Sequence, residues 1–283
     1  YQKLLDSLNK RKTPVLVTGV LDSQKIHLTY SLQSHSKRPV IILTSDELKA
    51  KQIYEDMQFF LKDKVHLYPA KDILFYSADV HSTDIIKQRL YILKELIEGK
   101  KPIIILSIEA MLDRLVKKDI FKSFILKLEV GNIINIKELT RQLVLMGYEH
   151  TELVENPGQF ALRGGIVDIY PGISSTPFRM EFWDDEIDSI REMDALTQRS
   201  IEKLNKIEIF PMRELVFTEE IIDQGIFSIE KEAKNTFKRL EDKGFREQKE
   251  ALTKTIATLI EKLKNQKSFQ GIEGYIRYFY EET

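Results

Sequence analysis

Residues 156–200 read NPGQFALRGGIVDIYPGISSTPFRMEFWDDEIDSIREMDALTQRS, and the interpretation of the whole chain starts from this stretch. Short runs of strand-forming residues in it are separated by turn-forming pairs, which are Pro157-Gly158, Gly164-Gly165, Pro171-Gly172 and Asp184-Asp185. The stretch therefore predicts four short strands joined by tight turns.

The side chains of these strands divide into two faces, because successive residues of a strand point in opposite directions. With the phenylalanines in the core, the other side of the sheet carries Arg163, Arg179 and Trp183, the only tryptophan of the chain. Trp and Arg are the residue types that most often anchor protein interfaces. We predict that these three residues form a protein-binding surface, which we call the outward face. One alternative is a second core over this side of the sheet, with Trp183 buried. Another is a solvated face on which Arg163 and Arg179 pair with Glu181. The pattern alone does not decide between these interpretations.

The composition limits the classes of function. Among 283 residues, 43 Lys and Arg stand against 44 Asp and Glu, so the net charge of −1 argues against a protein that coats nucleic acid. The hydrophobic content of 42% is typical of a soluble globular protein, and no apolar run reaches the roughly 20 residues of a membrane span. The absence of cysteine excludes thiolate chemistry and is compatible with the cytoplasm, where we expect the protein. Because the chain starts at Tyr1, we expect it to be a piece of a longer protein.

Residues 1–120 alternate between apolar runs of strand length and amphipathic helices. The predicted strands are residues 14–20, 39–44, 64–68 and 102–107, and the predicted helices are residues 47–61, 84–98 and 108–116. Continuous apolar strands are typical of parallel sheets that are buried on both faces. This part is predicted to be an α/β domain with crossover helices.

Residues 121–211 are predicted to form an α+β module with an antiparallel sheet, set into or after the first domain. Besides the four strands described above, it has predicted strands at 123–130, 148–154 and 204–210 and a helix at 136–146. Residues 212–283 are predicted to be helical, with helices at 219–225, 226–243 and 245–264, and to return to the first domain.

Residues 19–26, GVLDSQKI, resemble a phosphate-binding loop that has lost two of its functional groups. The pattern G-x-x-x-x-G-K-[ST] is met at Gly19 and Lys25, but Gln24 replaces the second glycine and Ile26 replaces the hydroxyl residue. A Cβ at the glycine position obstructs the wrapping of phosphates, and isoleucine cannot bind magnesium. We predict that this stretch no longer binds nucleotide; a weak residual nucleotide site is the alternative.

No other arrangement of residues predicts catalysis or metal binding. The acidic residues of 181–188 are interpreted as solvated turn carboxylates, because neither a calcium-loop pattern nor a nearby histidine accompanies them. The five histidines are scattered, and we identify no catalytic constellation. The arginines of the four-strand stretch alternate with carboxylates, so strong binding to a DNA backbone is not expected.

The four-strand stretch also carries a family resemblance. GQFALRGGIVDIYP at 158–171, FR at 178–179, FWDDEIDSIR at 182–191 and TQRS at 197–200 resemble the amino-terminal part of bacterial transcription-repair coupling factors, the Mfd family. The repair protein UvrB is similar in a looser way, including GIEGY at 271–275. UvrB has a working phosphate loop, and the replaced residues Gln24 and Ile26 therefore favour the Mfd family.

The resemblance implies both a fold and a role. It implies a nucleotide-free, RecA-like parallel-sheet domain with an inserted α+β domain, as in the UvrB homology module. The inserted domain in this family binds UvrA, and its contact residues match Arg163, Arg179 and Trp183, where relatives often carry Phe at the Trp183 position. ATP and Mg belong to motor domains of the parent protein, and RNA polymerase and DNA are bound by other parts of it. Other domains of the parent are thought to mask the UvrA-binding face until the motor engages a stalled polymerase.

Together these observations predict a non-catalytic adaptor that recruits UvrA in transcription-coupled nucleotide-excision repair. The alternative is an ATP-dependent, UvrB-like helicase or DNA damage recognition module. Gln24 and Ile26 argue against the helicase, and the net charge argues against a direct damage sensor.

Overall fold

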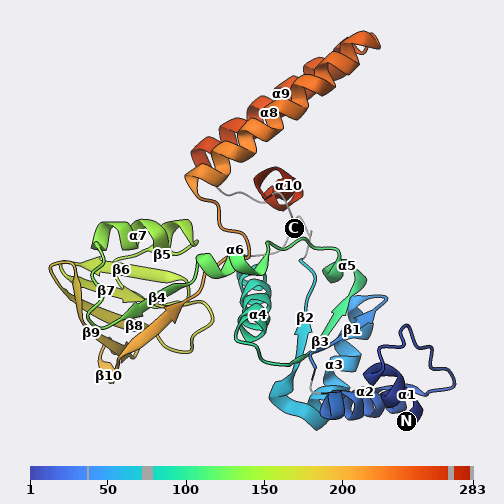
Figure 1. Cartoon of the computed structure of the whole chain (residues 1–283). Coiled ribbons are helices and arrows are strands. Elements are labelled where there is room, and N and C mark those ends of the chain that lie inside the picture. The colour runs from blue at the N-terminus through green and yellow to red at the C-terminus, as the bar shows by residue number, and fades with distance from the viewer. Residues whose placement is uncertain (37, 72–78, 267–270, 281–283) are drawn as a thin grey trace. The chain divides into compact units, whose positions relative to one another are not determined.

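The structure is a computed structural model that describes residues 1–36, 38–71, 79–266 and 271–280. The chain divides into two compact units, Tyr1–Asp113 and Arg114–Thr283 (Figure 1). The boundaries expected near residues 120 and 211, and the return of the last segment to the first domain, stay predictions.

The first unit contains a parallel sheet, as predicted, with three of the four predicted strands. Its order is β1-β3-β2, with β1 at Val40–Thr44, β2 at Val65–Tyr68 and β3 at Ile103–Ser107. The helices are α1 Gln2–Asn9, α2 Asp22–Ser36, α3 Glu47–Leu61, α4 Asp79–Ile97 and α5 Ile108–Met111, with a short 3-10 helix at Lys62–Lys64. The α3 helix begins where Asp46 accepts a hydrogen bond from the backbone N–H of Lys49 at 2.8 Å.

Strand β3 is buried on both of its faces. Ile103 and Ile105 lie in one core cluster with residues of α2 and α3, and Ile104 and Leu106 lie in another with residues of α4 and α5. Helices therefore cover both sides of the sheet, which is why β3 is apolar at nearly every position.

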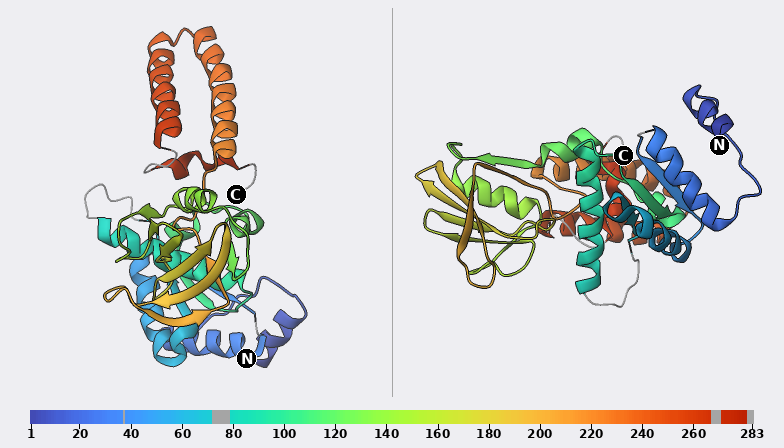
Figure 2. Two further views of the ribbon diagram at one scale, coloured as in Figure 1. Left: turned by 90° about the vertical axis from the view of Figure 1, so that its left-hand side faces the viewer. Right: turned by 90° about the horizontal axis from the view of Figure 1, so that it is seen from below.

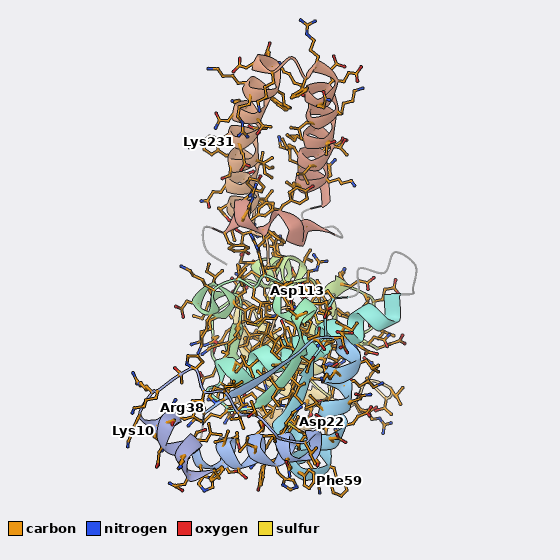
Figure 3. The ribbon with its side chains drawn as sticks, turned by 90° about the vertical axis from the view of Figure 1, so that its right-hand side faces the viewer. Lys10, Asp22, Arg38, Phe59, Asp113 and Lys231 are labelled. Carbon is orange, nitrogen blue, oxygen red and sulfur yellow. The ribbon has the colours of Figure 1, made fainter. Side chains whose placement is uncertain are left out.

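The prediction of a strand at residues 14–20 is wrong. The structure has no strand there, and Leu16 is 88% exposed with Val15 and Val17 also exposed. β-Branched composition favours a strand but supplies no pairing partner, and sheets depend on long-range pairing. The helix predicted at 108–116 is also too long, since α5 ends at Met111. Another apolar side chain, Phe59, points away from α3 into solvent (Figure 3).

The second unit contains a six-stranded sheet in the order β10-β9-β8-β7-β6-β5. Its strands are β5 Glu149–His150, β6 Gln159–Arg163, β7 Ile166–Ile169, β8 Phe178–Trp183, β9 Glu186–Met193 and β10 Ser200–Leu204. The four strands β6 to β9 confirm the prediction from residues 156–200. The sheet is mixed rather than antiparallel, because β5 pairs with β6 in parallel.

Two further strands of this sheet differ from the prediction. Of the strand predicted at 148–154, only the two residues of β5 form a strand. The ladder with β6 ends where the backbone N–H of Thr151 donates to the carbonyl of Phe160 at 2.8 Å. Strand β10 was not expected; it pairs with β9. A separate two-stranded sheet joins β4 Leu126–Glu129 to β11 Lys206–Ile209.

The core of this sheet lies on the side of the phenylalanines, as predicted. Phe160, Val167 and Met180 are buried there beneath helix α7, Ile136–Leu145. Asn135 caps α7 by accepting hydrogen bonds from the backbone N–H groups of Lys137 and Glu138. The outward face is predicted on the opposite side of the sheet.

The remaining elements of the second unit are helices: α6 Lys118–Ser123, α8 Glu219–Asp242, α9 Arg246–Gln266 and α10 Ile276–Phe279, with a 3-10 helix at Ile272–Tyr275. Helices α8 and α9 run side by side (Figure 2) and are separated at Gly244, as predicted. Residues 219–242 form one helix rather than two. Gly225, where the first predicted helix ended, lies within α8, and the Phe279 ring packs against it. None of the helices in the described ranges is long and apolar enough to cross a membrane.

Candidate protein-binding face

The strand register places the two predicted arginines on one face of the sheet. Two cross-strand rows lie on the side away from the core. One row consists of Ala161, Asp168, Arg179 and Arg191, and the next of Arg163, Ile166, Glu181 and Ser189. Directly opposed residues share a face of the sheet. The period-two pattern therefore assigned Arg163 and Arg179 to the correct side.

A buried carboxylate holds both arginines. Asp168 is fully buried and accepts hydrogen bonds from Nε of Arg179 at 2.7 Å and from its Nη2 at 2.8 Å. Nη2 of Arg163 donates to the same carboxylate. The hydrogen bonds to Asp168 raise the pKa of the Arg179 guanidinium above its ordinary value. A bidentate pair with a buried carboxylate fixes the direction of the guanidinium, so Arg179 is held in place rather than free to rotate.

Sequence reasoning missed Asp168 and named another partner. The alternative interpretation paired the arginines with Glu181, whereas Glu181 instead accepts from Ser189 at 2.8 Å and from Arg191 at 3.2 Å. The signal that could have identified Asp168 is its place in β7. It alternates with the core residues Val167 and Ile169 and so faces the side of the arginines.

A turn partly covers Arg179. Its Nη1 donates to the carbonyl of Gln198 at 3.4 Å, and the Gln198 amide donates in turn to the carbonyls of Val154 and Ala195. The Arg179 side chain is consequently only 18% exposed, against 42% for Arg163. Arg163 is therefore the more accessible of the two to a partner.

The side chain of Trp183 is largely exposed to solvent. It lies at the end of β8, opposite Glu186, and is 81% exposed. A bulge at Asp188 lets Phe182 face the core opposite Ile187 while Trp183 faces outward. The interpretation that buries Trp183 in a second core is wrong.

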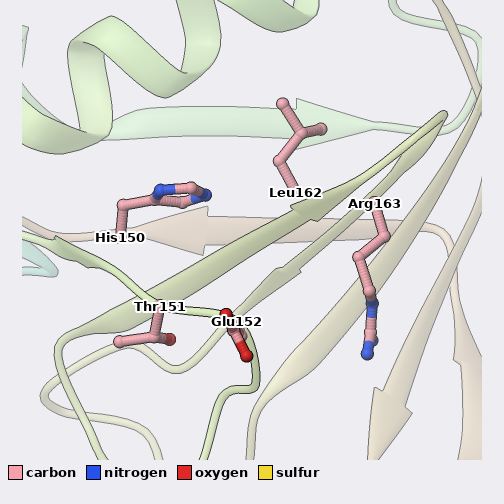
Figure 4. A pocket seen from close by; sticks show the side chains of 5 residues that line it. All are labelled: His150, Thr151, Glu152, Leu162 and Arg163. Carbon is pink, nitrogen blue, oxygen red and sulfur yellow. The ribbon is translucent and has the colours of Figure 1, made fainter.

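Arg163 also borders a shallow hollow at the edge of the sheet. The hollow has a volume of about 330 Å³ and is lined by His150, Thr151, Glu152, Leu162 and Arg163 (Figure 4). Leu162 and Arg163 leave the strand on opposite sides (Figure 4). The pairing of β6 with β5 ends before these two residues, which leaves this edge open.

The stretch resembling a phosphate loop is folded around its own side chains. Helix α2 begins at Asp22, whose carboxylate pairs with Nζ of Lys25 at 2.7 Å and whose pKa is lowered chiefly by that hydrogen bond. Gln24 accepts a hydrogen bond from the backbone N–H of Leu21 at 3.1 Å, and Ile26 is buried in the core. The lysine that would bind phosphate thus has a carboxylate partner within its own helix.

The acidic turn of the sheet is held by hydrogen bonds. Asp185 accepts from the side-chain amide of Asn135 at 3.2 Å. Among the residues that the structure describes, no three His, Asp or Glu side chains gather closely enough to hold a metal ion.

Comparisons of the sequence with known proteins identify a family. Residues 126–215 match the family described as the UvrB interaction domain. The transcription-repair-coupling factor of Bacillus subtilis is 32% identical over 284 aligned residues, covering 100% of this chain and 24% of the relative. Those of Staphylococcus epidermidis and Staphylococcus aureus are 33% and 32% identical, covering 74% and 73% of this chain and 18% of each relative.

The chain thus spans about a quarter or less of the length of these curated relatives. The similarity to the Bacillus subtilis protein extends through both compact units, while the family match falls within the second unit and contains Arg163, Arg179 and Trp183. The chain is therefore homologous to the amino-terminal region of bacterial transcription-repair coupling factors and contains a UvrB interaction domain.

Proposed function

We propose that this chain is a non-catalytic adaptor that recruits UvrA in transcription-coupled nucleotide-excision repair. In this proposal the outward face docks on UvrA, and the parent protein delivers UvrA to RNA polymerase stalled at a DNA lesion. Other domains of the parent cover the face until the motor engages the polymerase. The motor, with its ATP and Mg, and the contacts to polymerase and DNA belong to parts of the parent outside this chain.

The observation that carries the proposal is the outward face itself. An 81% exposed tryptophan and two arginines project from one side of the domain that matches the UvrB interaction domain. Large aromatic and arginine side chains dominate the binding energy of protein interfaces. The homology to transcription-repair coupling factors supports a role in this repair pathway.

We further propose that the first unit is a RecA-like domain that has lost nucleotide binding. Three parallel strands with helices on both faces support this fold. The ion pair between Lys25 and Asp22, together with Ile26 in the core, supports the loss of phosphate binding. An ATP titration that gives micromolar affinity would overturn the non-catalytic part of the proposal and favour a UvrB-like helicase.

The adaptor role is tested by calorimetric titration of the 283-residue chain into UvrA. We expect the wild type to bind and Trp183→Ala to lose about 2 kcal/mol or more of binding free energy, which is roughly thirtyfold in affinity. Because Trp183 is 81% exposed, this variant should unfold at the same temperature as the wild type.

The UvrA affinity of Arg179→Ala is a second measurement of the same kind, and Arg141→Ala is its matched control. Arg141 is an exposed arginine of α7, on the core side of the sheet, and we expect its loss to leave UvrA affinity unchanged. Absence of binding by a well-folded wild type would contradict the adaptor role. Equal losses for Arg141→Ala and Arg179→Ala would contradict the location of the face.

A further inference from the structure

A third cross-strand row continues the outward face beyond Trp183. Trp183 opposes Glu186 across the β8–β9 hairpin, and Glu186 in turn opposes Ile133 from the segment between β4 and α7. Ile134 donates to the carbonyl of Asp185 at 2.7 Å, and Ile187 donates to the carbonyl of Asn132 at 2.9 Å. These two hydrogen bonds bring the segment of Ile133 alongside the start of β9.

Ile133 points to the same side as Trp183. Residues that oppose one another in a ladder have their side chains on one face, so Trp183, Glu186 and Ile133 form one row. The neighbouring Ile134 packs against the core on the other side, as strand alternation requires. Ile133 is 80% exposed and Trp183 81% exposed. Two strand spacings separate them, which is about 10 Å.

The row therefore consists of two large apolar side chains with a carboxylate between them. Single exposed apolar residues are common on protein surfaces. Trp183 and Ile133 instead lie on either side of Glu186 and extend the predicted interface, so the three residues form one patch. Among the described residues, no cation forms an ion pair with Glu186.

We propose that Ile133 and Glu186 belong to the UvrA-docking surface, with Ile133 as a second apolar anchor beside Trp183. This inference rests on the proposed function and adds a prediction about the partner. The UvrA surface that covers the row should present apolar side chains to Trp183 and Ile133 and a basic side chain to Glu186. A basic residue there would complement the charge of Glu186, which forms no ion pair among the residues that the structure describes.

The test is calorimetric titration of the 283-residue chain into UvrA with Ile133→Ala, Glu186→Gln and the control Val144→Ala. Val144 is an exposed, β-branched residue of α7, which packs on the core side of the sheet. We expect Ile133→Ala to lose about tenfold in affinity, less than Trp183→Ala because the isoleucine side chain is smaller, and Val144→Ala to bind like the wild type. We expect Glu186→Gln to weaken binding and to reduce its dependence on salt.

The double variant Trp183→Ala/Ile133→Ala tests whether the two residues contact the same part of UvrA. If one UvrA patch covers both residues, the two losses should depart from additivity in free energy, because residues that share a partner couple. All variants change exposed residues, and thermal unfolding checks that they fold like the wild type.

The outcomes separate the two proposals. Binding by the wild type together with unchanged affinity of Ile133→Ala would overturn the extension and leave the adaptor role in place. No binding by a folded wild type would overturn the adaptor role and, with it, the extension.

Discussion

Asp168 determines how the two arginines of the outward face are presented. It is the fully buried carboxylate that both arginines share, and a buried charge is tolerated only where it is paired and hydrogen-bonded. The arginines are therefore part of the packing of the sheet as well as of its surface. The alternative interpretation was right that the two arginines pair with a carboxylate, but the carboxylate is Asp168 and not Glu181, and their role in an interface stays a prediction.

We predict that Asp168→Asn lowers the free energy of unfolding by about 3 kcal/mol, because it leaves two guanidinium groups next to one another without their shared carboxylate. Urea denaturation followed by far-UV circular dichroism measures the change. Asp188→Asn is the control, since Asp188 is exposed at the bulge and its replacement should change stability by less than about 0.5 kcal/mol. Equal stabilities for the two variants would show that Asp168 is not a structural clamp.

The sequence revealed the side of the sheet on which these residues lie but not their exposure. Period-two alternation is local, so Arg163, Arg179 and Trp183 could be placed together from residues 156–200 alone. The cover over Arg179 comes from Gln198, whose position depends on the return of the chain after β9. Such a contact is set by the packing of distant segments, which no local pattern records.

At the level of the elements, prediction succeeded where local signals were strong. Helix α3 begins at the Asp46 cap, the four strands of 156–200 lie between their predicted turns, and β3 is apolar because it is buried on both sides. It failed where tertiary pairing decides. Residues 14–20 lack a partner strand, β10 forms because β9 offers it an edge, and β5 ends at His150 because its pairing with β6 stops there.

The helix α8 offers a test in which helix propensity and packing act in opposite directions. Alanine in place of a glycine within a helix normally stabilises by about 1 kcal/mol. A Cβ at Gly225, however, would lie 2.1 Å from Cδ1 of Phe279, so we predict that Gly225→Ala destabilises by about 1–3 kcal/mol through displacement of the Phe279 ring. Differential scanning calorimetry of the chain provides the measurement.

Gly274→Ala is the matched control for this substitution. Nothing lies within 4 Å of a Cβ at Gly274, so its variant should unfold close to the wild-type temperature. A higher unfolding temperature for Gly225→Ala would mean that propensity outweighs the contact with Phe279.

On the scale of the whole molecule, the second unit contains two buried phenols that link its stability to pH. Tyr148 donates to the carbonyl of Phe210 at 2.7 Å and Tyr280 to the carbonyl of Val216 at 2.5 Å. Burial raises the pKa of both tyrosines above the ordinary value of about 10. Between the unfolded and folded pKa values, the unfolded chain loses these protons while the folded chain keeps them, so stability decreases as pH rises above about 10.

We predict that the unfolding temperature of the wild type falls between pH 9 and pH 11 and that Tyr148→Phe makes this fall less steep, because one phenol can no longer ionise. Thermal unfolding at several pH values measures both slopes. Identical slopes for the wild type and Tyr148→Phe would show that Tyr148 ionises as easily in the folded as in the unfolded chain.

The division into two units predicts that the second unit is sufficient for docking. Both of its core clusters are built from residues after Asp113, which is the property of a part that folds alone. We predict that a fragment of residues 114–283 folds and binds UvrA with the affinity of the full chain, measured by calorimetry. Weaker binding by a folded fragment would place part of the docking surface in the first unit.

The position of Trp183 has a spectroscopic consequence. Because the only indole of the chain is 81% exposed in the folded state, its fluorescence emission should already have the red-shifted maximum of an indole in water. Global unfolding would then change the emission maximum little, so tryptophan fluorescence would be a poor probe of the stability of this chain. Any molecule that covers the outward face would desolvate this ring and shift its emission to the blue, so the chain carries an intrinsic optical reporter at the site of its proposed docking.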